Sequence, residues 1–570
     1  MRYGKTWILL LTAALAAVVL LMWHLEPEAP LPTEETVMPV SVQVSAEGKE
    51  EKIHCWDNGH DRFFLFLPAF ADLNRTQLWL EPGTEVRLDG KTWTSGQTCE
   101  TIALGEKYTL EYSYAGVQRQ GTLTFLRSAQ IPSVHIRTQS GNMEYIHREK
   151  GNKESGSIHI YNADGSLSYN GNVSAISGRG NGTWSLKKKP YSLTLTAAAD
   201  LLGMGEADRW VLLANYTDDS QLRNKMVYDF AAAAGLPYSA QSRWVELYLN
   251  GEYAGMYQLS ERNEIHPQRV ALEEDNSFLV SQEWVWRLEA QEYPHYVLDS
   301  GFAMRIHHSS MEQEELRKLW QSAENAILSG DGIDPVTGKD WTQLIDVDSW
   351  ARKYLMEEIF GSLDAGAVSQ YFYGDAETGI IHAGPVWDFD LSCGNNEMWQ
   401  LQRPQAFFAD RKRVSAWLHS SWYYGLCRKE AFRQRVTELY REEFRPLLEI
   451  CLAEGMDAYA DEIREASLLN QIRWGMGPMQ EETEYIREYL TKRMAFLDSV
   501  WLEGDIWYTI LLDTDDGSNT VSYAIRPGDP IPQLPEIPGG TGWYHRETDL
   551  PVDLTQPVTE NMDIYLKYSE

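Results

Sequence analysis

Two carboxylates lie among apolar and aromatic residues in the segment from Gly384 to Asn395, GPVWDFDLSCGN. Asp388 and Asp390 alternate with Trp387 and Phe389, a pattern typical of the end of a short buried strand. An ionised carboxylate that leaves water loses solvation energy unless a cation meets it. We therefore expect a metal ion, a lysine or an arginine opposite this pair. An ordinary strand followed by a solvated turn is the alternative interpretation.

Candidate cations occur together in the segment 179–195, RGNGTWSLKKKPYSLTL. Arg179 stands beside glycines, and Lys188 and Lys189 directly precede an aromatic strand pattern. Successive side chains of a strand point to opposite faces, so one of the two lysines should face a ligand. Lysines on a solvated hairpin, and an arginine paired with a structural carboxylate, are the alternatives.

The elements that must position these residues extend over about residues 131–503. Strand-like runs such as RWVLLAN and WVELYLNGEYAGMYQL come first, and helical periodicity dominates the second half. Strands followed by helices predict an α+β fold with a β-rich lobe and an α-rich lobe. A cleft between two such lobes is a common place for a ligand.

Two smaller modules flank this region in the sequence. Short alternating runs with turn residues over residues 40–130 predict an Ig-like β-sandwich. The tail over residues 505–570 returns to strand patterns separated by proline and glycine, which predicts a separate small β module. The sequence therefore predicts a multidomain protein.

The beginning of the chain and its charge indicate where it acts. Residues 1–30 combine a basic start, an apolar run and an acidic, proline-rich continuation, which predicts a signal or membrane anchor. We favour an uncleaved anchor, with a bacterial cell-surface location, over a cleaved, secreted form. The net charge of −33 repels phosphate backbones, so no nucleic-acid partner is expected.

The five cysteines predict little chemistry. Cys55 and Cys99 fall in one predicted domain, where either a disulfide or two free thiols would fit. No CxxC spacing occurs, so a structural zinc site is not expected. Walker A, GxGxxG and HExxH motifs are also absent, and the lysine-rich segment has no role in a glycosidase.

Four stretches, in this order, resemble the CotH spore-coat kinase family. They are RGNGTWSLKKKPYSLTL (179–195), RWVLLANYTDDSQLRNKM (209–226), VELYLNGEYAGMYQLSER (245–262) and GPVWDFD (384–390). The resemblance covers about residues 131–503 and implies an atypical protein-kinase-like fold. It also implies transfer of the ATP γ-phosphate to Ser or Thr of surface or spore-coat proteins. The tail from residue 505 is similar to the Listeria–Bacteroides repeat of surface proteins.

The resemblance implies roles for the cationic residues. Phosphoryl transfer needs a cation on the phosphates that do not react. Lys189 is the expected phosphate-gripping lysine, with Lys188 and Arg179 as further ATP-binding residues. Glu261 matches a family glutamate and is either the partner of Lys189 or a surface residue.

The resemblance also implies roles for the acidic residues. Asp388 matches the metal-holding aspartate, with Asp390 as a second ligand or a supporting group, and the metal is Mg²⁺ or Mn²⁺. Asp364 matches the aspartate that orients the acceptor hydroxyl. Where related proteins have an asparagine, this chain has Ser369 and Gln370, of which Gln370 offers an amide oxygen to the metal. This departure favours the rival hypothesis of a catalytically silent surface or adhesion protein.

Overall fold

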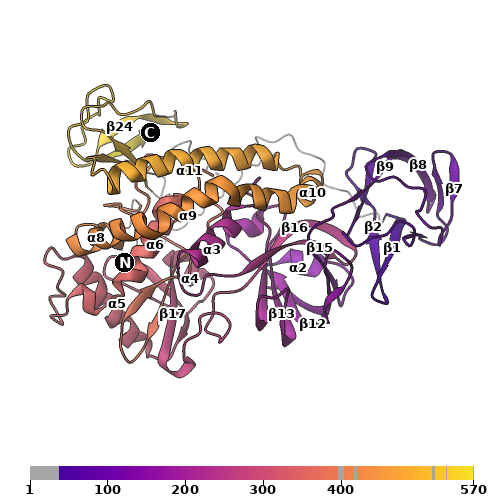
Figure 1. Cartoon of the computed structure of the whole chain (residues 1–570), viewed down its shortest axis with the longest axis horizontal. Helices are drawn as coiled ribbons and strands as arrows, with labels where there is room; N and C mark the ends of the chain where they lie inside the picture. Colours follow the sequence, from indigo (N-terminus) through magenta and orange to yellow (C-terminus); the bar gives the residue numbers. More distant parts are fainter. Residues whose placement is uncertain (1–37, 396–402, 416–419, 516–519, 535, 569–570) are drawn as a thin grey trace, which may run out of the picture.

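The computed structural model describes residues 38–395, 403–415, 420–515, 520–534 and 536–568. Within them the chain forms five sheets and a set of helices, so the protein is multidomain with mixed α/β content. Figure 1 shows the N-terminal strands at one end, the barrel beside them, the long helices along one side and the last sheet toward the other end. None of the described helices is long and apolar enough to cross a membrane. The predicted anchor over residues 1–30 lies outside the described residues.

Two sheets share a hydrophobic core at the N-terminal end. Their strands are β1 (Val40–Ala46), β2 (Lys49–His54), β3 (Trp56–Asp57), β4 (Arg62–Leu67), β5 (Gln77–Leu80), β6 (Glu85–Leu88), β7 (Lys91–Trp93), β8 (Lys107–Tyr114) and β9 (Val117–Arg127). The sheet orders are β2-β1-β5 and β3-β4-β9-β8-β6-β7. Val40, Val42 and Val44 are buried in the shared core, as the period of a strand requires. Cys55 and Cys99 are buried free thiols, so no disulfide joins them.

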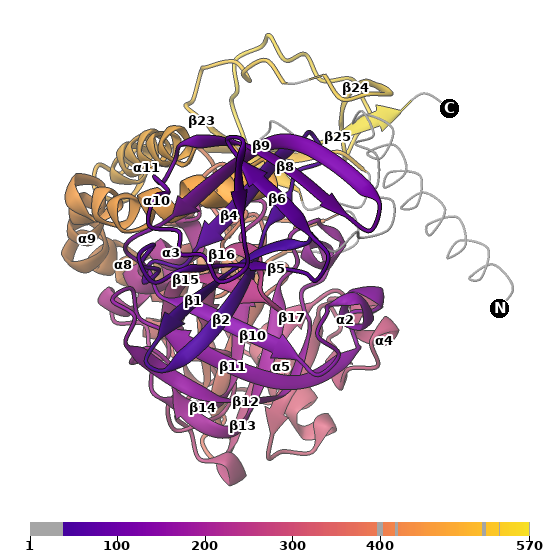
Figure 2. The ribbon, with the colours of Figure 1, turned by 90° about the vertical axis from the view of Figure 1, so that its right-hand side faces the viewer.

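Seven strands follow as a closed barrel in the order β10-β11-β12-β13-β14-β16-β15. They are β10 (Ser133–Thr138), β11 (Lys153–Tyr161), β12 (Leu167–Gly178), β13 (Tyr191–Asp200), β14 (Glu206–Leu213), β15 (Ser242–Leu249) and β16 (Glu252–Ser260). The parallel pair β10 and β15 closes the barrel around a core that includes Ile158 and Trp210. Figure 2 shows the N-terminal strands against this barrel, where Phe66 stacks on Tyr253 with ring centroids 4.6 Å apart.

The barrel is followed by a five-stranded sheet in the order β18-β19-β17-β20-β21. Its strands are β17 (Ser277–Glu283), β18 (His295–Val297), β19 (Ala303–Ser309), β20 (Gln370–Asp375) and β21 (Ile381–Ala383). Helices α3 (Arg223–Ala233), α5 (Gln313–Leu328) and α6 (Val347–Phe360) share its core, which includes Trp320 and Trp350. The side chain of Asp346 caps the start of α6, and Gly361 ends it with a φ of 62°. The turn that carries Asp364 comes directly after this helix end.

The remaining helices and a last sheet complete the chain. The helices are α2 (Glu144–Arg148), α4 (Val285–Ala290), α7 (Trp422–Leu426), α8 (Glu430–Leu439), α9 (Arg445–Ile450), α10 (Met456–Trp474) and α11 (Met479–Trp501). The last strands are β22 (Tyr508–Asp513), β23 (Val521–Ile525), β24 (Gly540–His545) and β25 (Met562–Tyr568). They form a sheet in the order β23-β22-β25-β24 with its own hydrophobic core, which lies against the long helices in Figure 1.

Candidate active site

A cavity of about 910 Å³ opens between the barrel and the five-stranded sheet. Its walls come from the turn after β12, from β13 and β14, from α3 and α4, and from β17, β19 and β20. The ionisable residues among its lining are Lys150, Lys153, Arg179, Lys188, Tyr216, Tyr228, Arg262, Glu283, Arg287, Tyr293, Arg305, His307, Asp364, Tyr371, Asp388 and Asp390. The cavity therefore brings together acidic and basic residues that lie more than two hundred positions apart in the chain.

Three aspartates form the acidic part of the cavity. Asp364 belongs to the turn after α6, while Asp388 and Asp390 follow β21. Asp388 is exposed and has a φ of 67°, which turns the chain between the two buried residues beside it. Its Oδ2 accepts a hydrogen bond from Ser369 Oγ at 2.9 Å, and Asp390 Oδ2 accepts one from Thr217 Oγ1 at 3.2 Å.

Burial and mutual repulsion disfavour negative charge on two of these aspartates, Asp364 and Asp390. Burial, followed by the charges of Asp388 and Asp390, raises the pKa of Asp364 well above its ordinary value. Burial and the charge of Asp388 raise the pKa of Asp390 to about 7. A cation between these groups would favour their ionised forms. A cation beside the DFD segment stays a prediction.

Arginines without carboxylate partners form the basic part of the cavity. Within the described residues, Arg179, Arg262 and Arg305 make no ion pair with an acidic side chain. Arg179 stacks on Trp387, with its guanidinium carbon 5.4 Å from the ring centroid, and its buried Nη1 has no hydrogen-bond partner. Burial lowers the pKa of Arg179. A buried guanidinium with an unpaired N–H is a ready donor for an anion.

The two adjacent lysines face opposite ways, and Lys188 is the one that lines the cavity. Its Nζ donates to the carbonyls of Ala214 and Met256, at 2.7 and 2.5 Å. Burial lowers the pKa of Lys188 well below its ordinary value. Lys189 instead donates to the carbonyls of Trp184 and Leu186 in the preceding turn. The assignment of Lys189 as the phosphate-gripping lysine is therefore not supported by its position.

The expected pair between Lys189 and Glu261 is wrong. Glu261 Oε1 accepts from Arg269 Nη1 at 2.6 Å, and its Oε2 accepts from the backbone N–H of Gln241 at 2.8 Å. The side chain is buried at the end of β16, where burial raises its pKa. Glu261 thus fixes the chain beyond the barrel, and its neighbour Arg262 reaches the cavity in its place.

Gln370 does not offer its amide oxygen to the aspartate carboxylates, contrary to its expected role as a metal ligand. Its Oε1 accepts from Lys353 Nζ at 3.0 Å, and its Nε2 donates to the carbonyl of Val368 at 3.1 Å. The residue before it, Ser369, lines the cavity because its φ of 56° turns the chain just before β20 begins. Ser369 is therefore the residue that meets Asp388.

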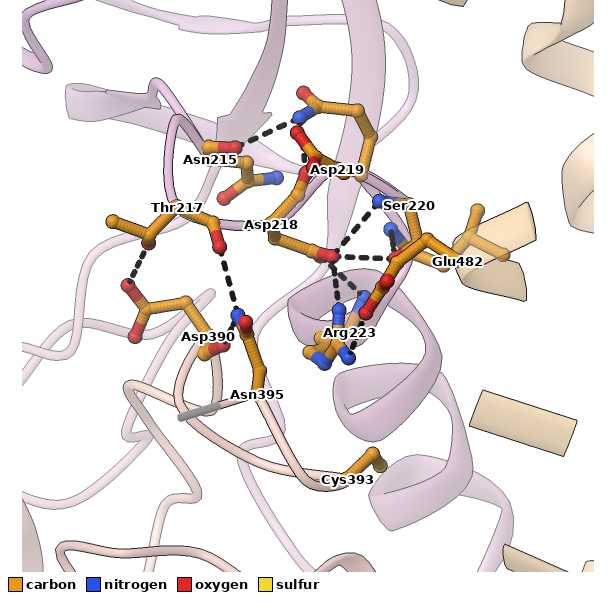
Figure 3. A network of polar contacts seen from close by, with 12 residues as sticks. Asn215, Thr217, Asp218, Asp219, Ser220, Arg223, Asp390, Cys393, Asn395 and Glu482 are labelled. Carbon is orange, nitrogen blue, oxygen red and sulfur yellow. Dashed lines mark hydrogen bonds and ion pairs between the residues drawn. The ribbon is translucent and has the colours of Figure 1, made fainter. Parts of the chain in front are cut away.

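A polar network holds the DFD segment against α3 (Figure 3). Arg223 pairs with Asp218 and Glu482 at 2.5 Å each, and its Nε donates to the carbonyl of Ser392 at 2.9 Å. Asn395 Nδ2 donates to the carbonyl of Asp390 at 2.7 Å. Arg223 and Asp218 are buried, and each guanidinium nitrogen of Arg223 is bonded within the protein, which leaves none of them free for a ligand. These contacts give Arg223 and Asp218 a structural role.

Sequence reasoning did not identify several cavity residues: Lys150, Ser369, Arg262, Arg287 and Arg305. Arg262 ends the family-like stretch VELYLNGEYAGMYQLSER, so its place in that motif was a usable signal. The other arginines come from β19 and from α4, where no motif marks them. Their role follows only from the way the five-stranded sheet faces the barrel.

The donor set fits a nucleotide with one divalent cation. No group of three or more His, Cys, Asp or Glu able to hold a metal occurs within the residues that the structure describes. Mg²⁺ commonly binds through one or two carboxylates and the phosphates of its nucleotide, so Asp388 and Asp390 suffice as its protein ligands. The orphaned N–H of Arg179 fits a phosphate oxygen.

Comparison with known proteins agrees with this geometry. No curated protein matches the sequence. The profile of the family described as "CotH kinase protein" matches residues 176–497, more than half of the 570 residues. The match begins just before Arg179, includes all three aspartates and ends within α11. The chain belongs to the CotH kinase protein family, and its domain over these residues is kinase-like.

Proposed function

We propose that this protein is an ATP- and divalent-metal-dependent kinase. It transfers the γ-phosphate to Ser or Thr residues of proteins on the cell surface or spore coat, and its N-terminal segment anchors it outside the cytoplasm. The observation that carries the proposal is the single cavity in which Asp364, Asp388 and Asp390 meet Arg179, Arg262 and Arg305. A triphosphate and its metal ion would match the charges on both sides of this cavity.

Each part of the cavity has a role in this scheme. Arg179, Arg262 and Arg305 bind the phosphates, since guanidinium groups match phosphate oxygens in geometry and charge. Asp388 and Asp390 hold the metal ion, which when bound neutralises charge on the transferred group. Asp364 orients the acceptor hydroxyl and takes its proton. The raised pKa of Asp364 suits a group that must accept a proton near neutral pH.

One observation favours a second candidate function, a catalytically silent kinase-like surface protein. The amide oxygen of Gln370 bonds to Lys353, so it adds no ligand beside Asp388. Ser369 offers only a hydroxyl there. In this case the cavity would bind a nucleotide without transferring its phosphate.

The test uses the full chain with labelled ATP and Mn²⁺, and measures nucleotide binding and phosphate incorporation separately. We expect Asp364→Asn to keep nucleotide affinity and to lose at least about a hundredfold in transfer. Asp388→Asn should weaken both. Glu377→Gln, at an exposed carboxylate on the turn after β20, is the matched control and should behave as wild type. Binding without transfer would support the silent alternative, and absence of nucleotide binding would refute both functions.

A further inference from the structure

The C-terminal sheet is bound to a segment that follows the DFD motif, here called segment 403–415. Three hydrogen bonds connect them. The backbone N–H groups of Ala524 and Thr520 donate to the carbonyls of Gln405 and Val414, respectively. The side chain of Arg411 donates through Nη1 to the carbonyl of Thr520. Strand β23 and the residue before it thus contact segment 403–415 near both ends of that segment.

Side chains strengthen this connection. Arg413 pairs with Asp513 and, at 2.6 Å, with Asp563, which lie on β22 and β25. Ser522 Oγ accepts from the N–H of Phe407 at 2.9 Å. Asp513 is buried and pairs also with Arg546, at 2.7 Å. The last sheet is therefore docked on the kinase-like domain through charged and main-chain contacts.

Arg411 continues from this interface to the turn that carries Asp364. Its Nη2 donates to the carbonyls of Leu363 and Ala365, the residues on either side of Asp364. The side chain is only 2% exposed. One rigid guanidinium therefore joins the carbonyl of Thr520 to both sides of the Asp364 turn.

The surroundings of Arg411 indicate that it does more than fill space. Each hydrogen bond found for it in the described part of the chain goes to a main-chain carbonyl, and its buried Nε has no partner. Burial lowers the pKa of Arg411 to about 10, although the charges of Glu358 and Asp364 act in the opposite direction. A buried charge held only by carbonyls stabilises a fold less than an apolar side chain of similar volume. The position of Arg411 is better explained by its hydrogen bonds to three carbonyls, those of Thr520, Leu363 and Ala365.

The kinase-like domain holds the other side of the same segment. Glu358 of α6 accepts from the N–H groups of Phe408 and Ala409, at 3.0 and 2.9 Å, and pairs with Arg493 at 2.8 Å. Segment 403–415 is thus clamped between α6 and the C-terminal sheet. The turn after α6 is attached to that clamp through Arg411.

We propose that the C-terminal sheet fixes the turn carrying Asp364 for phosphoryl transfer, with Arg411 as the positioning residue between them. The catalytic half of this inference rests on the proposed function. Its structural half, that the docked sheet restrains residues 361–370, does not. The last sheet then contributes to phosphoryl transfer by the kinase-like domain, in addition to any role in attachment.

The first test loosens the docking at a distance from the turn. Arg413→Gln removes the links to Asp513 and Asp563, whereas Lys412→Gln, in the same segment, removes only an exposed contact with Glu547 at 3.7 Å, which contributes little. In the full chain we expect hydrogen exchange over residues 361–370 to become about tenfold faster in Arg413→Gln, because local opening becomes easier. Exchange in Lys412→Gln should equal that of the wild type. Barrel residues 156–161 serve as an internal reference and should not change.

The second test separates positioning from binding. Arg411→Lys keeps a positive charge but loses the planar fork that spans the carbonyls. We expect kcat to fall about tenfold with little change in KM for ATP, since the interaction serves the transition state. Loss of nucleotide affinity in proportion would mean a merely structural role and would overturn the inference.

The outcomes distinguish this inference from the proposed function. If the wild type transfers no phosphate, the proposed function fails, and the exchange measurement still decides whether the sheet restrains the turn. Equal exchange over 361–370 in the wild type, Arg413→Gln and Arg411→Lys would overturn the inference. Faster exchange in the barrel reference as well would indicate global destabilisation and would also count against it.

Discussion

Ser369 shows at the residue scale how one backbone angle decides which side chain reaches a site. Its φ of 56° is in the left-handed region, and this turns Ser369 toward Asp388 and Gln370 toward Lys353. Serine rarely adopts this conformation, whereas asparagine accepts it more readily. Residue 369 is thus the position where an amide oxygen would face the metal ligands.

Ser369→Asn is therefore expected to improve metal use. The amide oxygen would lie beside Asp388 as a further ligand, and the backbone at this position suits asparagine. We expect the Mn²⁺ concentration needed for half-maximal nucleotide binding to fall about threefold or more, with unchanged or slightly higher thermal stability. Titration of Mn²⁺ at fixed ATP measures the shift.

Gln370→Asn is the matched control for this substitution. It adds an asparagine one residue later, where the side chain faces Lys353 and not the cavity. We expect it to lower stability without improving metal use, because the buried Lys353 loses an acceptor. An equal response to Mn²⁺ in both variants would contradict the geometry described for residue 369.

The adjacent lysines show which part of the site the sequence predicted and which part it did not. Alternation predicted that one of Lys188 and Lys189 would face the cleft, and Lys188 lines the cavity, where its Nζ binds two carbonyls. Strand β13 begins only at Tyr191, so strand periodicity did not decide between them. The turn over Gly182–Ser185 decides it, because Lys189 binds the carbonyl of Trp184 there. Such a contact depends on turn geometry that residue spacing does not specify.

At the scale of elements, hydrophobic periodicity and the turn residues between the runs predicted strands and helices well. The strand-like run RWVLLAN forms most of β14, and WVELYLNGEYAGMYQL forms β15 and β16 with the turn between them. The closure of the barrel was not predicted, because the parallel pair β10 and β15 joins strands about a hundred residues apart. Pairing at that distance depends on the shape of the whole sheet and leaves no local pattern.

Strand β15 is buried on both faces, and this has a measurable consequence for Glu246. Val245 and Leu247 point into the barrel core, while Glu246 points outward and is nonetheless fully buried. Tyr253 OH donates to its Oε1 at 3.4 Å, and its Oε2 has no partner. Burial raises the pKa of Glu246 to about 8.

The free energy of unfolding should therefore fall as pH rises, because the fold favours the neutral form of Glu246. Its folded-state pKa lies above the unfolded value of 4.5, so the neutral form is favoured in the fold, and stability falls between about pH 4.5 and 8 and levels off above that. Glu246→Gln keeps a neutral group at the same place. We expect Glu246→Gln to have a larger free energy of unfolding than the wild type. The difference between the two proteins should grow by about a few kcal/mol between pH 5 and 9.

Denaturant titrations at several pH values measure this difference. Glu252→Gln, at an exposed glutamate on the neighbouring strand β16, is the control and should follow the wild type. If the wild type and Glu246→Gln show parallel pH dependence, the carboxyl group is ionised in the fold and the burial argument is wrong.

At the scale of the whole molecule, composition predicted three successive β-rich or mixed regions but not how firmly they pack on each other. The hairpin residue Gly251 shows this for the N-terminal sheets. Its φ is 87°, and a Cβ there would lie 2.5 Å from the carbonyl oxygen of Lys52. Asn250 and Gly251 form an Asn-Gly pair, which is typical of a tight hairpin turn. The close approach of β2 to that turn needed the structure.

A charged cluster at the same interface attaches the N-terminal sheets to the barrel. Glu51 of β2 accepts from His159 Nδ1 at 2.6 Å, from Tyr161 OH at 3.1 Å and from Arg137 Nη2 at 2.9 Å. Burial alone would raise the pKa of Glu51, but the His159 hydrogen bond and the charges of His135 and Arg137 lower it to about 2. Glu51 is therefore ionised and multiply bonded in the fold.

Glu51→Gln should weaken this attachment, whereas Glu50→Gln, at an exposed neighbour, should not. The pKa of Glu51 is depressed, so its stabilisation is present above the unfolded value of 4.5 and is lost as pH falls toward about 2. At pH 7 we expect Glu51→Gln to lose about 2 kcal/mol and to exchange faster over residues 49–54. The gap from wild type should close in acid, where the wild-type carboxyl is also neutral. A gap that persists undiminished below about pH 2 would mean that shape, and not charge, holds the interface.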